Sequence, residues 1–282
     1  LLLTAAIWGF AFVAQRAGME HVGPFTFNGV RFALGGFSLM PLLLLKTHKR
    51  KYPLKQGMQI IYAGSIAGLA LFLGSSFQQI GLVYTTAGNA GFITGLYVII
   101  VPAIGLFSKQ KAGKGVWIGA ILAAAGMYFL SIQKGFTINF GDLLVFICAF
   151  FFALHVIIVG WLSPKHNAVR LSIIQFFVTA VLSFIAAMIA EEILWQDILN
   201  AAIPLIYGGV FSAGVAYTLQ VVAQKDAPSG HAAILLSLEA VFAVLGGWLL
   251  LSETVTIRTG IGASLMMAGM IAAQWQRFGK TA

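Results

Sequence analysis

The chain has 282 residues, of which 60% are hydrophobic and only 9% are charged. A soluble globular domain has about 25% charged residues, so this composition excludes an ordinary soluble protein and predicts an integral membrane protein. The net charge of +9 does not indicate nucleic-acid binding, because the basic residues gather in short loops between apolar runs, where they set membrane orientation.

Continuous apolar runs recur along the whole chain. A helix of about 20 residues crosses the hydrocarbon core of a membrane, and continuous rather than alternating runs favour helices over barrel strands. In chain order, the predicted transmembrane helices span residues 1–19, 24–45, 57–82, 86–107, 113–132, 140–161, 170–190, 199–223, 228–250 and 257–275. Because the first run opens without a methionine, we expect the chain to be trimmed at this end.

The basic residues predict the orientation of these ten helices. Most of the 17 Lys and Arg residues fall in alternate loops, above all in residues 46–56 and 109–114, and in the C-terminal tail. Most acidic residues fall on the opposite side, among them Glu20, Asp142 and Glu191. The positive-inside rule therefore places both termini in the cytoplasm, and we expect a bacterial inner membrane.

Cysteine and histidine usage gives no sign of a metal or redox site. The one cysteine, Cys148, lies within a predicted helix, which excludes a disulfide inside the chain. No Cys and His residues have zinc-ligand spacing, and no phosphate-binding loop is present. We therefore expect no metal, no cofactor and no catalytic residues.

Internal repetition is the most informative feature of the sequence. WIGAILAAAGM at 117–127 matches GIGASLMMAGM at 260–270, which lies 143 residues further on. A similar offset, 144, pairs Trp8 with Phe152 near the other end of each half. The sequence therefore predicts two repeats, 1–134 and 140–277, each with five helices. Because five is odd, the second repeat would enter the membrane from the opposite side, as in many secondary transporters.

Three stretches carry a family resemblance: IWGFAFVAQR at 7–16, TTAGNAGFITGLYVIIVPAIG at 85–105 and DAPSGHAAILLSLEAVFAVLGGWLLLSE at 226–253. With the two Ala-Gly-Met helices, they resemble the EamA family of the drug/metabolite transporter superfamily over nearly the entire chain. The resemblance implies an all-α integral membrane protein of two inverted five-helix repeats (5+5). It also implies a central pathway surrounded by the first, third, fourth, sixth, eighth and ninth helices, and export of amino acids or other small metabolites.

Glu239 is the most prominent candidate for a functional residue, because it lies midway along the predicted helix 228–250. A charge at that depth is costly and needs a partner or water. Its carboxylate could bind a substrate amine, could carry a proton as the coupling ion, or could serve only as a structural contact. The family often has Glu-Pro here, whereas Ala240 follows Glu239, so the sequence predicts no proline-dependent break in this helix.

Other polar and aromatic side chains lie deep in predicted helices, where they could line the pathway or bond neighbouring helices. Together with Glu239, the predicted pathway residues are Trp8, Gln78, Asn89, Tyr97, His155, Tyr217 and Gln220. Arg31 is a buried charge whose repeat counterpart, Gln175, is also polar, which favours a structural role. The pairs Gly64–Gly68, Gly91–Gly95 and Gly115–Gly119 predict close helix packing and do not indicate an oligomer.

These observations lead to one functional hypothesis and two alternatives. The chain is expected to be a secondary active transporter, an exporter of amino acids or related amphipathic solutes, that works by alternating access. Its partners would be a small-molecule substrate, the lipid bilayer and protons. The alternatives are an intramembrane enzyme, either a hydrolase or a lipid transferase, and a channel. An enzyme is not expected, since GVFSAG at 209–214 lacks the pattern of a nucleophile elbow.

Overall fold

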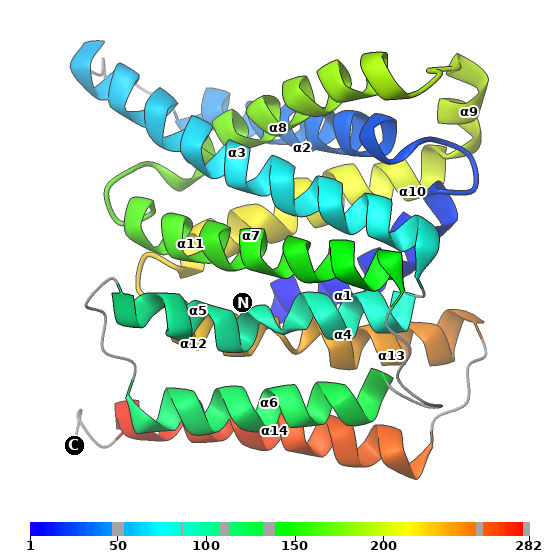
Figure 1. Ribbon diagram of the computed structural model, residues 1–282. Helices are drawn as coiled ribbons and strands as arrows, with labels where there is room; N and C mark the ends of the chain where they lie inside the picture. Colours follow the sequence, from blue (N-terminus) through cyan, green and yellow to red (C-terminus); the bar gives the residue numbers. More distant parts are fainter. Residues whose placement is uncertain (47–53, 86, 108–112, 132–138, 252–255, 279–282) are drawn as a thin grey trace.

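The computed structural model describes residues 1–46, 54–85, 87–107, 113–131, 139–251 and 256–278, which form a helical bundle (Figure 1). Within these ranges there is no β-strand, so the predicted all-α class is confirmed. The helices are α1 (Leu2–Gly18), α2 (Pro24–Lys46), α3 (Leu54–Tyr84), α4 (Ala87–Gly95), α5 (Tyr97–Phe107), α6 (Lys114–Ser131), α7 (Phe140–Leu162), α8 (Ala168–Ala190), α9 (Trp195–Asn200), α10 (Ala202–Ile206), the π-helix η1 (Tyr207–Tyr217), α11 (Thr218–Ala223), α12 (Ser229–Leu236), α13 (Glu239–Leu251) and α14 (Ile257–Phe278).

The helices coincide with the predicted apolar runs. In the described part of the chain, five helical stretches are long and apolar enough to cross a membrane: Gly57–Tyr84, Phe140–Leu162, Ala168–Ala190, Ala202–Ala223 and Ser229–Gly246. Shorter apolar helices cover Leu2–Gly18, Ala90–Leu106, Lys114–Phe129 and Ile257–Ala273. The count of ten crossings stays a prediction.

Local polar contacts fix where two of the helices begin. Asn139 caps α7: its side chain accepts a hydrogen bond from the backbone N–H of Asp142, whose carboxylate accepts one from the N–H of Asn139. The carboxylate of Glu191, at the end of α8, accepts bonds from the backbone N–H groups of Phe25 and Thr26 at 2.7 and 2.8 Å. Glu191 thereby satisfies donors at the start of α2 that have no partner within the helix.

The prediction of continuous helices over 86–107 and 228–250 was wrong. The first is interrupted at Leu96, between α4 and α5, and the second at Ser237 and Leu238, between α12 and α13. Proline causes neither break. Leu96 lies between Gly95 and Tyr97, and at the second break Glu239 is followed by Ala240. At the second break the Ser237 hydroxyl instead donates to the carbonyl of Ile234 at 2.9 Å, where it competes with the helical backbone bond.

The two breaks share one pattern of backbone hydrogen bonds. The carbonyl of Leu96 accepts bonds from the N–H groups three and four positions further on, at 3.0 and 3.2 Å, and so does the carbonyl of Leu238, again at 3.0 and 3.2 Å. This pattern aligns Tyr97, the first residue of α5, with Glu239, the first residue of α13, 142 residues later. By this alignment, the counterpart of Glu239 is Tyr97.

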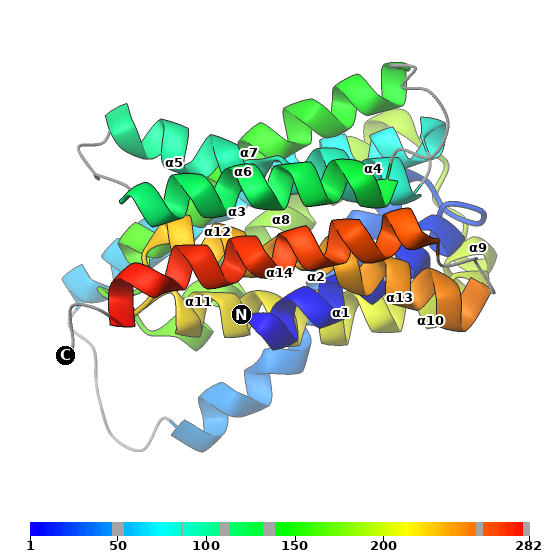
Figure 2. The same cartoon turned by 90° about the horizontal axis from the view of Figure 1, so that it is seen from below.

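The matching Ala-Gly-Met helices, α6 and α14, lie side by side and run antiparallel (Figures 1 and 2). A Cβ added at Gly119 would lie 2.6 Å from the carbonyl oxygen of Gly269, and one at Gly126 would lie 2.5 Å from that of Gly262. The two contacts are reciprocal, because the repeat pairs Gly119 with Gly262 and Gly126 with Gly269. Glycine lets the two backbones approach closely.

Helices α2 and α8 form a second antiparallel pair. Gly29 lies against Phe184 and Gly36 against Phe177, so residue numbers rise along α2 in the direction in which they fall along α8. The predicted close packing at Gly64 and Gly68 is also present, since both glycines of α3 contact α8. These pairs place α2, α3 and α8 on one side of the bundle, opposite α6 and α14 (Figure 1).

Candidate functional site

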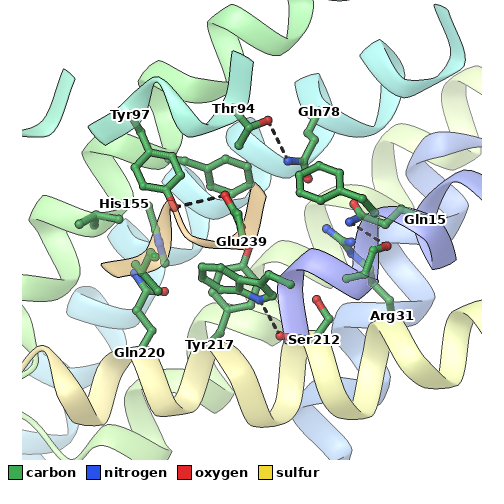
Figure 3. Close-up of a pocket in the computed structure, with 16 residues that line it drawn as sticks. Gln15, Arg31, Gln78, Thr94, Tyr97, His155, Ser212, Tyr217, Gln220 and Glu239 are labelled. Atoms are coloured by element: carbon green, nitrogen blue, oxygen red, sulfur yellow. Dashed lines mark hydrogen bonds between the residues drawn. The ribbon is translucent and has the colours of Figure 1, made fainter. Parts of the chain in front are cut away.

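A cavity lies where the two interrupted helices meet α1, α2, α3, α7 and η1 (Figure 3). Its empty space is about 490 Å³, of which only about 40 Å³ is open to the centres of water molecules. A single water needs about 10–15 Å³ of such space, so the cavity as it stands admits a few waters and no larger solute. Its polar lining consists of Gln15, Arg31, Gln78, Thr94, Tyr97, His155, Ser212, Tyr217, Gln220 and Glu239.

The interrupted helices place a hydrogen-bonded pair in the cavity. The Tyr97 hydroxyl donates to Oε1 of Glu239 at 3.2 Å, and both side chains are buried. Glu239 occupies the first turn of α13, where the helix dipole favours an acidic group. The bond joins the two residues that the backbone pattern aligns, so equivalent positions of the two breaks contact each other directly.

One face of α1 borders the cavity through Trp8, Ala11, Phe12 and Gln15, a helical spacing of three, four and seven residues. The helix comes close because Gly9 has no side chain: a Cβ there would lie 2.7 Å from the carbonyl oxygen of Glu239. α1 therefore packs on the first turn of α13 and brings the ring of Trp8 into the cavity.

The π-helix η1 forms another wall of the cavity. The indole Nε1 of Trp8 donates to the backbone carbonyl of Ser212 at 3.2 Å, and the hydroxyl of Thr4 donates to that of Ala216 at 3.3 Å. Trp8 also packs on Tyr217, with ring centroids 4.5 Å apart and planes inclined at 57°. These contacts fix two aromatic rings beside the open space. π-helical turns are rare and occur often at functional sites.

Neighbouring helices hold the remaining amides and the histidine in place. His155 Nε2 lies 3.0 Å from Oε1 of Gln175 on α8. Gln220 donates to Gln224 at 2.9 Å, and Gln224 donates to the carbonyl of Val156, also at 2.9 Å. Oε1 of Gln220 is buried and has no hydrogen-bond partner among the described residues. One end of the Gln220 amide is thus anchored, while its oxygen is left as an unused acceptor at the cavity.

A second polar contact joins α3 to α4. Nε2 of Gln78 donates to the hydroxyl of Thr94 at 3.2 Å, and this hydroxyl lies 3.8 Å from the Cys148 sulfur. All three side chains are buried. The contact positions Gln78 on the side of the cavity opposite Gln220 (Figure 3).

Arg31 on α2 is only 3% exposed, and its guanidinium lies over the rings of Phe27 and Phe32, with centroids at 5.7 and 4.7 Å. Its Nε is buried, and no atom in the described part of the chain forms a hydrogen bond with it. Among the described residues, none places a carboxylate at bonding distance. The cavity therefore contains one guanidinium and one carboxylate, which do not pair with each other.

The structure brings the predicted residues together around this cavity, with one exception. Trp8, Gln78, Tyr97, His155, Tyr217, Gln220 and Glu239 all line it. The side chain of Asn89 lies outside the described residues. Arg31, for which the sequence favours a structural role, also lines the cavity.

Sequence reasoning missed Gln15, Thr94 and Ser212. Gln15 lies seven residues after Trp8, so the helical period could have found it. Thr94 lies three residues before Tyr97, but Gly95 and Leu96 separate the two helices there. Ser212 lies five residues before Tyr217, a spacing that brings side chains together in a π-helix and not in an α-helix.

Known proteins match the chain over its entire length. The model of the EamA-like transporter family matches it twice, over residues 1–132 and 139–273. The chain belongs to the EamA-like transporter family. It is therefore an integral membrane transporter of the drug/metabolite transporter superfamily and not an enzyme.

Several curated proteins are similar to this EamA-like chain. An uncharacterized transporter of Archaeoglobus fulgidus is 35% identical over 272 residues, which cover 96% of this chain and 83% of the relative. The uncharacterized transporter YoaV of Bacillus subtilis is 24% identical, with 96% and 94% covered. The threonine/homoserine exporter RhtA of Escherichia coli K12 is 24% identical, with 91% and 83% covered.

The fold is similar to that of a protein of known crystal structure, with a TM-score of 0.79 and 17% sequence identity. The match covers 100% of this chain and 98% of the other chain. At this identity the match concerns the fold alone. The match extends over the full bundle and not over one half.

Proposed function

We propose that this protein is a secondary active transporter that exports amino acids or related small amphipathic solutes by alternating access. One observation carries the proposal: a single cavity contains a carboxylate, a guanidinium and two packed aromatic rings, and the interrupted helices meet at it. Discontinuous helices commonly form the substrate sites of secondary transporters. That RhtA is a threonine/homoserine exporter supports the substrate class and the direction.

Two inverted repeats, 1–134 and 140–277, would form the moving halves. The duplicate family match, the shared pattern of hydrogen bonds at the two breaks and the antiparallel α6–α14 pair support this division. Helices from both repeats border the cavity, so rocking one half against the other would open it to either side in turn. The small space now open to water supports a state in which the cavity is contracted.

The proposed orientation places both termini in the cytoplasm of a prokaryotic cell, in the bacterial inner membrane or its equivalent. The excess of Lys and Arg in alternate loops supports it. In this orientation the Glu191 contact with the start of α2 faces the cell exterior, as does the bond between Thr85 and Asp142.

We also propose that protons drive export and that Glu239 carries them. The titratable groups that interact with it come from three elements: Tyr97 of α5, Cys148 of α7 and Tyr217 of η1. Among the described residues, no basic side chain forms an ion pair with the Glu239 carboxylate, although Arg31 and His155 line the same cavity. A carboxyl that is protonated in one conformation and ionised in the other would couple the two fluxes.

Counterflow in proteoliposomes tests the transport proposal. Vesicles loaded with an unlabelled solute should accumulate the same labelled solute, and the panel should include amino acids, amines, nucleosides and drugs. We expect exchange of amino acids, and a fall of about tenfold in Trp8→Ala, which removes the ring that packs on Tyr217.

Trp161→Ala is the matched control, because Trp161 is 60% exposed and borders no part of the cavity. Its exchange rate should equal that of the parent. Absence of exchange for every class of solute, in monodisperse protein, contradicts the proposal.

A further inference from the structure

Arg31 differs from two other charged residues of the bundle, Arg16 and Glu191, in its hydrogen bonds. Arg16 donates to the carbonyls of Leu82 and Thr85 at 2.7 and 3.0 Å. Glu191 accepts three hydrogen bonds from the start of α2. Arg31 is nearly fully buried and makes none within the described part of the chain, where its only close partners are two aromatic rings. Arg31 therefore does not join two helices by hydrogen bonds, as Arg16 and Glu191 do.

A buried guanidinium without a counter-charge is costly, and ring contacts offset only part of the cost. The donors of a guanidinium form a fork that matches a carboxylate. Because Arg31 lines the cavity, a solute that enters could supply this missing partner.

Glu239 provides the opposite charge in the same space. It is 4% exposed, and its one hydrogen bond comes from the neutral hydroxyl of Tyr97. In Figure 3, Arg31 and Glu239 lie on different sides of the cavity. Two charges of opposite sign are thus kept apart, each without an ionic partner.

We propose that Arg31 binds the carboxylate of the transported solute while Glu239 binds its ammonium, so that the cavity selects zwitterions. The inference rests on the proposed transport function and makes Arg31 a substrate-binding residue. The rings of Trp8 and Tyr217 offer an apolar surface to the body of the solute. A solute with a single charge leaves one of the two buried charges unpaired, and this penalty is the source of selectivity.

Three solutes test the proposal, each measured by counterflow: L-threonine, its carboxamide and its N-acetyl derivative. If another amino acid of the panel exchanges faster, its own analogues replace them. The parent should prefer the zwitterion by about tenfold or more over each singly charged analogue, the size of effect expected for losing a charge-assisted hydrogen bond.

Arg31→Gln should lower exchange of threonine and of N-acetylthreonine, both carboxylates, but should not lower that of the carboxamide, which no longer leaves a buried guanidinium unpaired. A purely structural arginine would lower all three equally. Arg31→Lys, which keeps the charge, should retain the preference for a carboxylate, and it decides the matter if Arg31→Gln does not yield folded protein.

Arg258→Gln is the matched control, because its guanidinium also lies near two rings, those of Tyr128 and Phe129 at 5.4 Å each, but outside the cavity. Its preference among the analogues should match the parent. Equal exchange of all three analogues by the parent overturns the role of Arg31 and leaves the transport proposal intact. Absence of exchange for every solute instead contradicts transport itself.

Discussion

The charged side chains of the cavity show what sequence reasoning can reach at the scale of single residues. Polar groups deep in apolar helices are costly, so Glu239, Tyr97 and Gln220 could be selected for contact with one another or with a solute. Their partners could not be predicted, because the Tyr97–Glu239 bond depends on two helix breaks that bring the positions together. The lack of an ionic partner for Arg31 was likewise invisible before the packing was known.

Glu239→Gln tests both roles proposed for Glu239, as the proton carrier and as the group that binds the ammonium of the solute. The amide oxygen can still accept the bond from Tyr97, but the side chain no longer carries a proton. We expect a proton gradient to stop driving uphill export of threonine, while exchange of its N-acetyl derivative, which has no ammonium, stays near the parent value. The measurement is solute efflux with and without an imposed pH difference.

Tyr97→Phe is the control for this experiment, because it removes the hydrogen bond and keeps the carboxyl. It should retain gradient-driven export at a reduced rate. Gradient-driven export that persists undiminished in Glu239→Gln contradicts the assignment of Glu239 as the proton carrier.

At the scale of helices, the sequence predicts location well and continuity poorly. Apolar runs locate the described helices, because a helix that lies in lipid or in the core of the bundle needs a long stretch of apolar residues. The break at Ser237 and Leu238 has no proline to mark it, and the π-helix η1 has no pattern that distinguishes it from an α-helix. The match between 117–127 and 260–270 predicts a repeat, and the structure adds that the two stretches are in contact, since glycines from both pack on each other.

Gly126→Val should destabilise the α6–α14 pair. A Cβ at Gly126 would lie 2.5 Å from the Gly262 carbonyl oxygen and 2.6 Å from Cγ of Met266, so the two helices must separate. Overpacking of this kind costs about 1–3 kcal/mol, which thermal unfolding in detergent would register as a lower midpoint. Gly260→Val on α14 is the control, because a Cβ there meets nothing within 4 Å. Equal midpoints for the two variants contradict tight packing at Gly126.

For the molecule as a whole, the sequence predicts two repeats with an odd number of helices each. That number would require equivalent helices to run in opposite directions, and α6 and α14 do so. The sequence does not specify which ends of the two halves touch. In the structure, the Thr85 hydroxyl, which follows α3, donates to Asp142 of α7 at 2.6 Å and joins the proposed halves at one end of the bundle.

A cross-link at this contact should stop transport if the halves rock. Cysteines at Thr85 and Asp142, in a chain with Cys148→Ser, would be joined by a short thiol cross-linker, and counterflow should be lost. A reducible linker should restore it on reduction. Cysteines at Gln196 and Asn200, which contact each other within α9, provide the control and should transport normally when cross-linked. Full activity of the Thr85–Asp142 cross-linked protein contradicts movement at this end.

The meeting of Tyr97 with Glu239 has a consequence for how such a chain could arise from a duplicated gene. In two identical halves, a residue at the helix break would face its own copy: a glutamate would meet a glutamate, and a tyrosine would meet a tyrosine. Two carboxylates in contact repel each other, and two tyrosines provide no carboxyl group. A tyrosine can meet a carboxylate there only after the copies have diverged, so these two positions should change together among the descendants of the ancestral duplication.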